Sequence, residues 1–207
     1  MKLYFSPGAC SLASHIVLRE LGLPFDAVQV DLMKKTTKSG EDFAAINPKG
    51  YVPALALDEG GLLTEGVAIL QYLADRRPEA KLAPAHGTME RYRLQEWLAF
   101  INSELHKQFS PLFNPSTPEQ TKETARKAIA RRLGYVEAQL DGRPFLTGEK
   151  FTVADAYLYT VLGWTKHVGV DLAPFPRVVA FRERVGARPA VQAAQAAEHA
   201  TRASAAK

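Results

Sequence analysis

The chain has 207 residues, of which 46% are hydrophobic and 23% charged, so it can bury a core and its composition argues against disorder. The formal net charge of +4 comes from basic residues scattered among acids, which argues against a nucleic-acid interface and allows at most a preference for small anions. A single cysteine excludes an intramolecular disulfide and fits a reducing cytoplasm, and no apolar run is long enough for a signal peptide or a membrane span. We therefore expect a cytoplasmic protein.

The first eleven residues place the only cysteine, Cys10, directly before a predicted helix. A short apolar strand over residues 1–5 and a Pro-Gly turn precede it, and residues 11–21 carry apolar side chains at helical spacing. Because free N–H groups and the dipole at a helix N-terminus favour an anion, we expect the pKa of this thiol to lie below its usual value of about 8.5. A buried, apolar cysteine is the alternative, but the turn and Ser11 favour exposure.

The next segments predict a mixed sheet. Residues 25–32 alternate apolar and polar side chains, so the order strand, helix, strand favours a parallel pair. A polar loop over residues 33–40 follows, in which Lys35 is either simply solvated or reaches an anion near the thiol. After a short helix at residues 41–46, residues 51–63 predict two strands joined by a hairpin, which adds an antiparallel edge.

Val52-Pro53 and Glu65-Gly66 are the candidate ligand-binding positions of this first region. Proline cannot donate to a strand ladder, so Pro53 belongs at a strand start or in a cis turn. A cis bond would leave the N–H and C=O of Val52 free to pair with an extended ligand. The helix that begins near Gly66 can hold a carboxylate at its N-terminus, and Glu65 could pair with an ammonium group, although an acidic residue in a first helical turn is common.

A polar, proline-containing linker at residues 76–85 separates this region from an all-helical one. The spacing predicts one amphipathic helix over residues 88–109 and another over residues 119–140. Small or polar side chains form a second stripe on the first of these helices, namely Ala99, Ser103, His106 and Ser110. Further on, Thr152 is the predicted N-cap of a helix, and Asp155 is interpreted as its structural cap and not as a catalytic acid.

No other chemistry competes well in this sequence. The five histidines lack metal-ligand spacing, a second cysteine is missing, and there is neither a phosphate-binding glycine loop nor a GxSxG motif. We therefore predict no metal and no tightly bound cofactor.

Three motifs together resemble the glutathione-binding half of bacterial glutathione transferases, and of the beta class in particular. They are Cys10-Ser11 after a first strand, Asn47-Pro48-Lys49-Gly50-Tyr51-Val52-Pro53, and Leu63-Thr64-Glu65-Gly66. The resemblance implies a thioredoxin-like α/β domain at residues 1–80, with a mixed four-stranded sheet, and an all-α domain at residues 86–207 that contributes the hydrophobic co-substrate site. It also implies a homodimer.

The resemblance further implies a set of glutathione contacts. At Val52-Pro53, the main chain of Val52 would pair with the cysteinyl backbone of glutathione. Glu65 and Gly66 would hold the glutamyl end, and Lys35 would bind the glycyl carboxylate. In the helical half, Asn102-Ser103-Glu104-Leu105-His106-Lys107 is similar to the beta-class stretch beside the glutathione sulfur. His106 would lie next to that sulfur, and the stretch from Ser103 to Lys107 would bind the peptide, partly across a dimer interface.

Two mechanisms remain open on the sequence. In the first, the helix dipole, the Ser11 hydroxyl and His106 stabilise the glutathione thiolate, which attacks a hydrophobic electrophile. In the second, Cys10 forms a mixed disulfide with glutathione, as in thiol-disulfide exchange or reductive dehalogenation. A non-enzymatic binding or stress-regulatory protein of the same fold is the alternative function.

Overall fold

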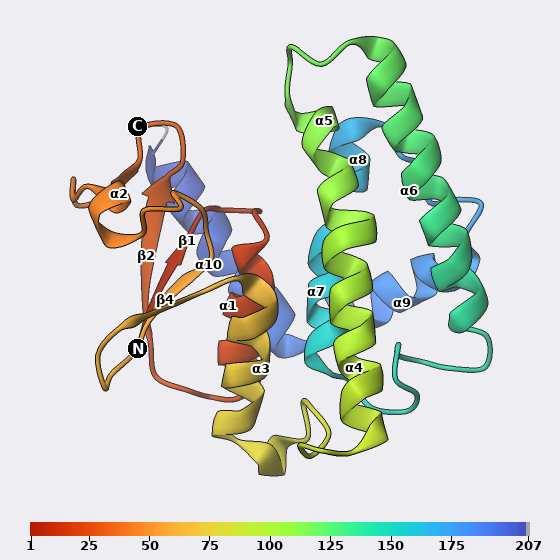
Figure 1. Ribbon diagram of the computed structural model, residues 1–207, viewed down its shortest axis with the longest axis horizontal. Helices are drawn as coiled ribbons and strands as arrows, with labels where there is room; N and C mark the ends of the chain where they lie inside the picture. The colour runs from red at the N-terminus through yellow and green to blue at the C-terminus, as the bar shows by residue number, and fades with distance from the viewer. Residues whose placement is uncertain (206–207) are drawn as a thin grey trace. The chain divides into compact units, whose positions relative to one another are not determined.

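The structure of the protein is a computed structural model that describes the backbone of residues 1–205 and the side chains of residues 1–201. It divides into two compact units (Figure 1). Unit 1 consists of Met1–Ala80 together with the described residues from Ala187 onward, and unit 2 of Lys81–Gly186. The last helix, α10 (Pro189–Ala205), packs against α1 (Ser11–Glu20) and therefore belongs to unit 1, whereas the sequence placed residues 86–207 in one helical domain.

The sheet of unit 1 is mixed, as predicted, and has the strand order β3-β2-β1-β4-β5. Its strands are β1 (Lys2–Phe5), β2 (Asp26–Asp31), β3 (Thr36–Thr37), β4 (Ala54–Ala56) and β5 (Leu62–Thr64). The pair β1–β2 is parallel and the other three pairs are antiparallel. Five strands replace the four expected, because β3 is too short to show an alternating pattern within its polar loop.

Both faces of this sheet are covered by helices. On one face, Tyr4 contacts Phe43 of α2 (Phe43–Ile46) with ring centroids 5.6 Å apart, and both join a buried cluster that includes Val52. Since successive residues of a strand point to opposite faces, Leu3 and Phe5 are buried on the other face, where α1 and α3 (Gly66–Arg76) pack together.

Unit 2 is built from helices around α7 (Val153–Leu162), every residue of which is buried. The remaining α-helices are α4 (Met89–Phe100), α5 (Ser110–Phe113), α6 (Glu119–Gln139), α8 (Thr165–Val168) and α9 (Pro176–Gly186). Within this unit, α4 and α6 run side by side (Figure 1). Among residues 1–205, none of the helices combines the length and the apolar character that crossing a membrane requires.

The helix expected over residues 88–109 is not one regular α-helix. Thr88 caps α4, which passes into the π-helical segment η2 (Ile101–Leu105) and then into the 3₁₀ segment η3 (His106–Phe109). Pro111 lies in the first turn of α5 and has no N–H for a bond to the preceding turn. The wider π turn rotates the residues after Leu105 about the helix axis, so the predicted polar stripe from Ala99 to Ser110 is not a straight line on one helix.

The predicted cap of α7 is confirmed. The Asp155 carboxylate is fully buried and accepts hydrogen bonds from Thr152 N–H at 2.7 Å, Thr152 Oγ1 at 2.8 Å and Leu146 N–H at 2.9 Å. Burial raises the pKa of Asp155 to about 6, while these hydrogen bonds act in the opposite direction. Phe151, which precedes the cap, is buried against Phe145.

Candidate functional site

Cys10 occupies the N-cap position of α1, as the sequence predicted, and is partly exposed. Its Sγ lies 3.1 Å from the carbonyl oxygen of Val52. A carbonyl oxygen can only accept, so in this contact the sulfur carries the proton and donates it. The thiol thus points at the backbone that the sequence identified as a peptide-binding edge, and any donor that binds this carbonyl competes with it.

Ser11 lies at the start of α1, and its side chain is fully buried. The hydroxyl donates to Ser6 O at 3.3 Å and accepts from Ser6 N–H at 3.2 Å. Ser11 therefore ties the turn before Cys10 to the start of α1, and this geometry does not support the role predicted for it as a donor to the glutathione sulfur.

The Val52-Pro53 peptide bond is cis, which is one of the two arrangements that the sequence allowed for Pro53. Val52 is 7% exposed, and in the described part of the chain its N–H makes no backbone hydrogen bond. Pro53 is the nearest neighbour of Gly66: a Cβ added to Gly66 would lie 3.7 Å from Pro53 Cγ, which is ordinary contact. The protein itself does not require glycine at position 66, so the missing side chain matters only for what binds there.

The N-terminus of α3 offers unpaired donors beside this edge. The carbonyl of Glu65 accepts from both Ala68 and Ile69, while within residues 1–205 no backbone acceptor is found for the N–H groups of Gly66 and Val67. Glu65 has a φ of 67°, in the left-handed region that side chains rarely adopt. Two N–H groups at the positive end of an eleven-residue helix form a suitable cradle for a carboxylate.

Lys49 is a charged partner that the sequence reasoning missed. Its Nζ lies 2.7 Å from Glu65 Oε1 and 3.0 Å from Thr64 Oγ1. Both members of the ion pair are more than half exposed, Lys49 by 52% and Glu65 by 68%. The partners are sixteen residues apart, so no local spacing could have revealed the pair. A ligand ammonium group that binds Glu65 has to compete with Lys49.

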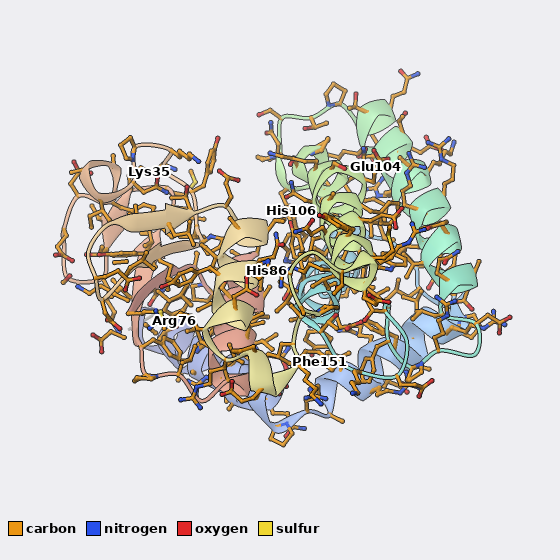
Figure 2. The ribbon with its side chains drawn as sticks, turned by 60° about the horizontal axis from the view of Figure 1, so that its bottom comes forward. Lys35, Arg76, His86, Glu104, His106 and Phe151 are labelled. Carbon is orange, nitrogen blue, oxygen red and sulfur yellow. The ribbon has the colours of Figure 1, made fainter. Side chains whose placement is uncertain are left out.

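Lys35 lies at the same edge of unit 1. Its Nζ donates to Gly50 O at 2.8 Å and sits 5.8 Å from the centre of the Tyr51 ring, so it spans from the loop after β2 to the turn that carries Val52 (Figure 2). Its φ of 56° also lies in the left-handed region. Unit 1 thus brings Cys10, Val52 and Lys35 together through the turn at residues 47–52.

In unit 2, His106 is held by aromatic and polar neighbours. Its Nδ1 lies 2.6 Å from the Tyr157 hydroxyl, which donates to Asn102 Oδ1 at 3.0 Å, and its ring meets Trp164 edge to face at a centroid distance of 4.8 Å. Burial, followed by the positive charge of Lys107, lowers the pKa of His106 to about 4. The imidazole is therefore neutral at pH 7. Tyr157 and Asn102 were not predicted as site residues.

The other residues predicted in this stretch point in different directions. Glu104 forms an ion pair with Arg132 of α6, whereas His106, two residues later, contacts α7 (Figure 2). Ser103 is exposed and donates to Ala99 O at 3.0 Å, and Lys107 is exposed. Leu105 is 1% exposed and its side chain packs in the core, so its contact with glutathione stays a prediction.

A buried polar network connects α10 to the turn that precedes Cys10. Glu198 accepts from Gly8 N–H at 2.8 Å and lies 3.0 Å from His15 Nδ1. Arg19 Nε donates to His15 Nε2 at 3.1 Å, so Nδ1 carries the ring hydrogen toward Glu198. Gly8 and Glu198 are 190 residues apart, and this separation explains why no sequence pattern indicated the contact.

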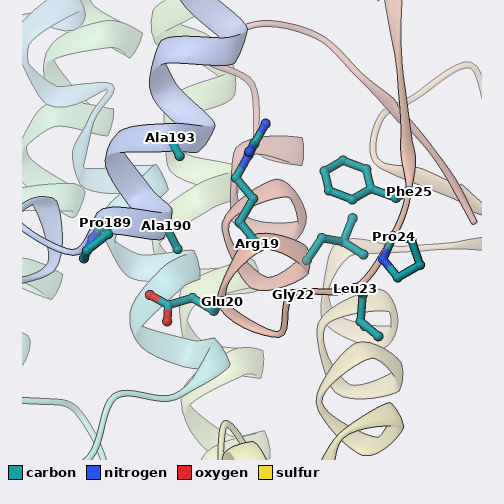
Figure 3. A pocket seen from close by; sticks show the side chains of 10 residues that line it. Arg19, Glu20, Gly22, Leu23, Pro24, Phe25, Pro189, Ala190 and Ala193 are labelled. Carbon is teal, nitrogen blue, oxygen red and sulfur yellow. The ribbon is translucent and has the colours of Figure 1, made fainter.

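A hollow of about 670 Å³ lies at the other end of α1, between its C-terminal turn and the start of α10 (Figure 3). Its walls are mostly apolar, and none of the predicted site residues lines it. Among residues 1–205, no cluster of three or more His, Cys, Asp or Glu side chains is placed to hold a metal ion.

The mixed sheet, the cysteine at the N-terminus of the first helix and the cis-proline before β4 define a thioredoxin-like thiol module, which here is joined to a helical unit. Family models agree with this assignment: residues 8–76 match the N-terminal domain of glutathione S-transferases and residues 100–189 match the C-terminal domain. The chain belongs to the glutathione S-transferase family and is a transferase enzyme.

Individual relatives support the bacterial beta-class resemblance. Glutathione S-transferase GstA of Escherichia coli O157:H7 is 52% identical over 96% of this chain and 98% of its own length. A sphingomonad glutathione S-transferase, solved in complex with glutathione, is 50% identical with a TM-score of 0.94 over 96% of this chain and 99% of that one. The beta-class glutathione S-transferase of Sphingomonas chungbukensis is 50% identical with a TM-score of 0.93, over 96% and 98% of the two chains.

Proposed function

We infer that this enzyme binds glutathione in an extended form along Val52 and conjugates it, through its sulfur, to hydrophobic electrophiles. The observation that carries the proposal is the arrangement of Cys10, whose thiol lies 3.1 Å from the carbonyl of Val52, directly before a cis-proline. A cysteinyl peptide that pairs with the main chain of Val52 would bring its own sulfur close to Cys10. The structure of the sphingomonad relative with glutathione supports the choice of this peptide.

The two ends of glutathione find complementary groups at the same edge. The glutamyl carboxylate fits the N–H groups of Gly66 and Val67 at the start of α3, and the glutamyl ammonium group fits Glu65 once Lys49 gives way. Lys35 at the other side of the Gly50 turn is placed for the glycyl carboxylate. Glutathione is then a co-substrate, and the conjugation reaction requires no further cofactor.

In the conjugation reaction, the glutathione thiol loses its proton and the thiolate displaces a leaving group from carbon. With a chlorinated substrate, the S–H and C–Cl bonds break, a C–S bond forms, and a proton and chloride are released. We assign His106 to the proton, on the resemblance of its segment to the beta-class stretch beside the sulfur. Ser103, Glu104 and Lys107 of the same segment are proposed peptide contacts, in part from the second subunit of a homodimer.

The thiol of Cys10 supports a second candidate activity, glutathione-dependent disulfide exchange. Cys10 thiolate attacks the glutathione sulfur of a disulfide between glutathione and another thiol, forms a mixed disulfide with glutathione and releases the other thiolate. A glutathione thiolate then attacks this mixed disulfide, which releases oxidised glutathione and regenerates the Cys10 thiolate. The partial exposure of Cys10 gives access for this attack. The non-enzymatic alternative explains neither the reactive position of this thiol nor the cradle at α3.

Intact mass and conjugation rates distinguish these reactions. Wild type and Cys10→Ala are incubated with oxidised glutathione and weighed, and both are assayed with a chlorinated aromatic electrophile and glutathione. One reducible adduct on wild type, with conjugation retained by the variant, assigns Cys10 to redox chemistry. No adduct, with conjugation lost in the variant, assigns Cys10 to polarisation of bound glutathione. Absence of all three, namely conjugation, adduct and retention on immobilised glutathione, would contradict the proposed function.

The homodimer and the cytoplasmic location are further parts of the proposal. The dimer rests on the family, and the location rests on the family together with the presence of a single cysteine in the sequence. Light scattering of the eluting protein should give twice the chain mass of 22.7 kDa. A monomer that retains full activity would exclude glutathione contacts from a second subunit.

A further inference from the structure

The side chains of Asn102, Tyr157 and His106 are connected in a row by hydrogen bonds. Tyr157 on α7 is 3% exposed, and its hydroxyl lies 2.6 Å from His106 Nδ1 and donates to Asn102 Oδ1 at 3.0 Å. Asn102 lies in the π-helical segment Ile101–Leu105, and His106 comes directly after that segment. Asn102 and His106 are four positions apart in the sequence, and both contact the Tyr157 hydroxyl.

The single hydroxyl hydrogen of Tyr157 decides which groups donate and which accept in these hydrogen bonds. A tyrosine hydroxyl has one hydrogen, and that hydrogen is given to the Asn102 carbonyl oxygen. Tyr157 can therefore only accept from His106, so Nδ1 of the imidazole carries the hydrogen. In a neutral ring, the other nitrogen, Nε2, is then left with a free lone pair.

We propose that Tyr157 and Asn102 are positioning residues that hold His106 in the Nδ1–H tautomer, so that Nε2 accepts the proton of the glutathione thiol. The inference rests on the proposed function, in which His106 is assigned to this proton. The S–H bond breaks, an Nε2–H bond forms, and the sulfur keeps the electron pair with which it attacks carbon. The imidazolium returns its proton to solvent after the product leaves.

Two independent features agree with this assignment. The lowered pKa of His106, about 4, keeps the ring neutral at pH 7, so Nε2 has a lone pair for a proton, although the same shift makes this nitrogen a weak base. Trp164 packs edge to face on the ring at 4.8 Å and Tyr157 at 5.9 Å, which restricts rotation of the imidazole. His106 thereby becomes an acceptor of the thiol proton, whereas the sequence reasoning treated it as a donor to the thiolate.

The tautomer can be measured directly on the ligand-free enzyme. Protein labelled with ¹⁵N-histidine is examined at pH 7.5 by long-range ¹H–¹⁵N correlation, and the His106 signals are assigned from His106→Gln. Wild type and Asn102→Asp, which keeps an acceptor, should show the Nδ1–H form. Tyr157→Phe should show a mixture, and Asn102→Leu should show the Nε2–H form, because the hydroxyl then turns to donate to His106. An Nε2–H wild type, or a tautomer unchanged in both Tyr157→Phe and Asn102→Leu, would overturn the proposal.

Kinetics separate this inference from the proposed function. Tyr157→Phe and Asn102→Leu should each lower kcat for conjugation about tenfold with the KM for glutathione within about twofold, and neither should add to the loss in His106→Gln. Asn102→Asp should restore most of the rate. Tyr159→Phe, a buried tyrosine on the same helix, is the matched control and should leave the rate unchanged.

A full rate in His106→Gln would refute the assignment of His106 to the thiol proton, and the tautomer spectra would still decide whether Tyr157 and Asn102 orient the ring. Loss of rate in His106→Gln with wild-type rates in Tyr157→Phe and Asn102→Leu would refute the inference alone. If Tyr157→Phe fails to fold, the two Asn102 variants give the same decision.

Discussion

At the scale of single residues, His106 links the site to stability. The folded protein keeps this ring neutral because burial lowers its pKa from 6.5 to about 4, whereas the unfolded chain binds the proton below pH 6.5. Between these two pH values the unfolded state binds more protons, so the free energy of unfolding rises with pH. The shift in the His106 pKa would contribute at most about 3 kcal/mol to the free energy of unfolding. This contribution is present above pH 6.5 and is lost as the pH falls to 4.

His106→Gln should therefore lose this part of the pH dependence. Urea unfolding of wild type and variant between pH 4 and 7 gives the difference in unfolding free energy, which should change in favour of the wild type as the pH rises. His199→Gln, at an exposed position on α10, controls for the loss of a histidine. Parallel curves for wild type and His106→Gln would show that the ring titrates alike in the folded and unfolded states.

The exposed pair of Lys49 and Glu65 gives a second prediction at this scale. Exposed ion pairs contribute about 0.2–1 kcal/mol, so Lys49 is a weak competitor for the carboxylate that the glutathione ammonium needs. Lys49→Gln should lower the KM for glutathione by about twofold to fivefold without a change in kcat, and Glu65→Gln should raise it. Lys34→Gln, which removes a comparable exposed pair with Asp31, is the control. A higher KM in Lys49→Gln would mean that Lys49 itself binds glutathione.

At the scale of elements, the capping box of α7 fixes the start of the most buried helix in unit 2. Thr152→Ala should cost about 1 kcal/mol, the usual cost of losing an N-cap side chain. Asp155→Ala should cost more, about 2–5 kcal/mol, because it leaves the N–H groups of Thr152 and Leu146 buried without an acceptor. Urea unfolding monitored by tryptophan fluorescence measures both costs. A loss below about 1 kcal/mol in Asp155→Ala would show that water replaces the carboxylate.

Some features of these elements could be predicted from the sequence, and others could not. Local signals predicted the cap of α7 and the position of Cys10 at the start of α1, because each depends on a few neighbouring residues. They left two arrangements open for Pro53, of which the structure shows the cis bond. The burial of Ser11 was not predictable, since it depends on the fold of the turn around Ser6. The π turn was missed because a helical period cannot show one inserted residue. The contacts of Lys49, Tyr157 and Glu198 link residues far apart in the chain.

At the scale of the whole molecule, the compact units do not follow the change from α/β to all-helical sequence. The composition changes near residue 80, and that boundary agrees with the end of the first part of unit 1. Helix α10 has an amphipathic helical pattern like its predecessors, yet it returns to cover α1. The pattern predicts a helix with one apolar face, but it contains nothing that specifies which surface this face covers.

A chain that ends at Gly186 tests this return directly. Removal of α10 uncovers apolar residues of α1 and leaves Gly8 N–H and His15 without Glu198, so unit 1 should lose stability although its first 80 residues are intact. We expect faster hydrogen exchange at the amides of α1, a lower melting temperature and loss of retention on immobilised glutathione. Glu198→Ala removes only the polar contacts of α10 with Gly8 and His15, and it should lower the free energy of unfolding by about 1–3 kcal/mol. His199→Ala, at an exposed position on the same helix, should have little effect. Wild-type exchange in α1 of the shortened chain would show that unit 1 folds without its C-terminal helix. In that case the sequence-based boundary would describe the folding units better than the contacts do.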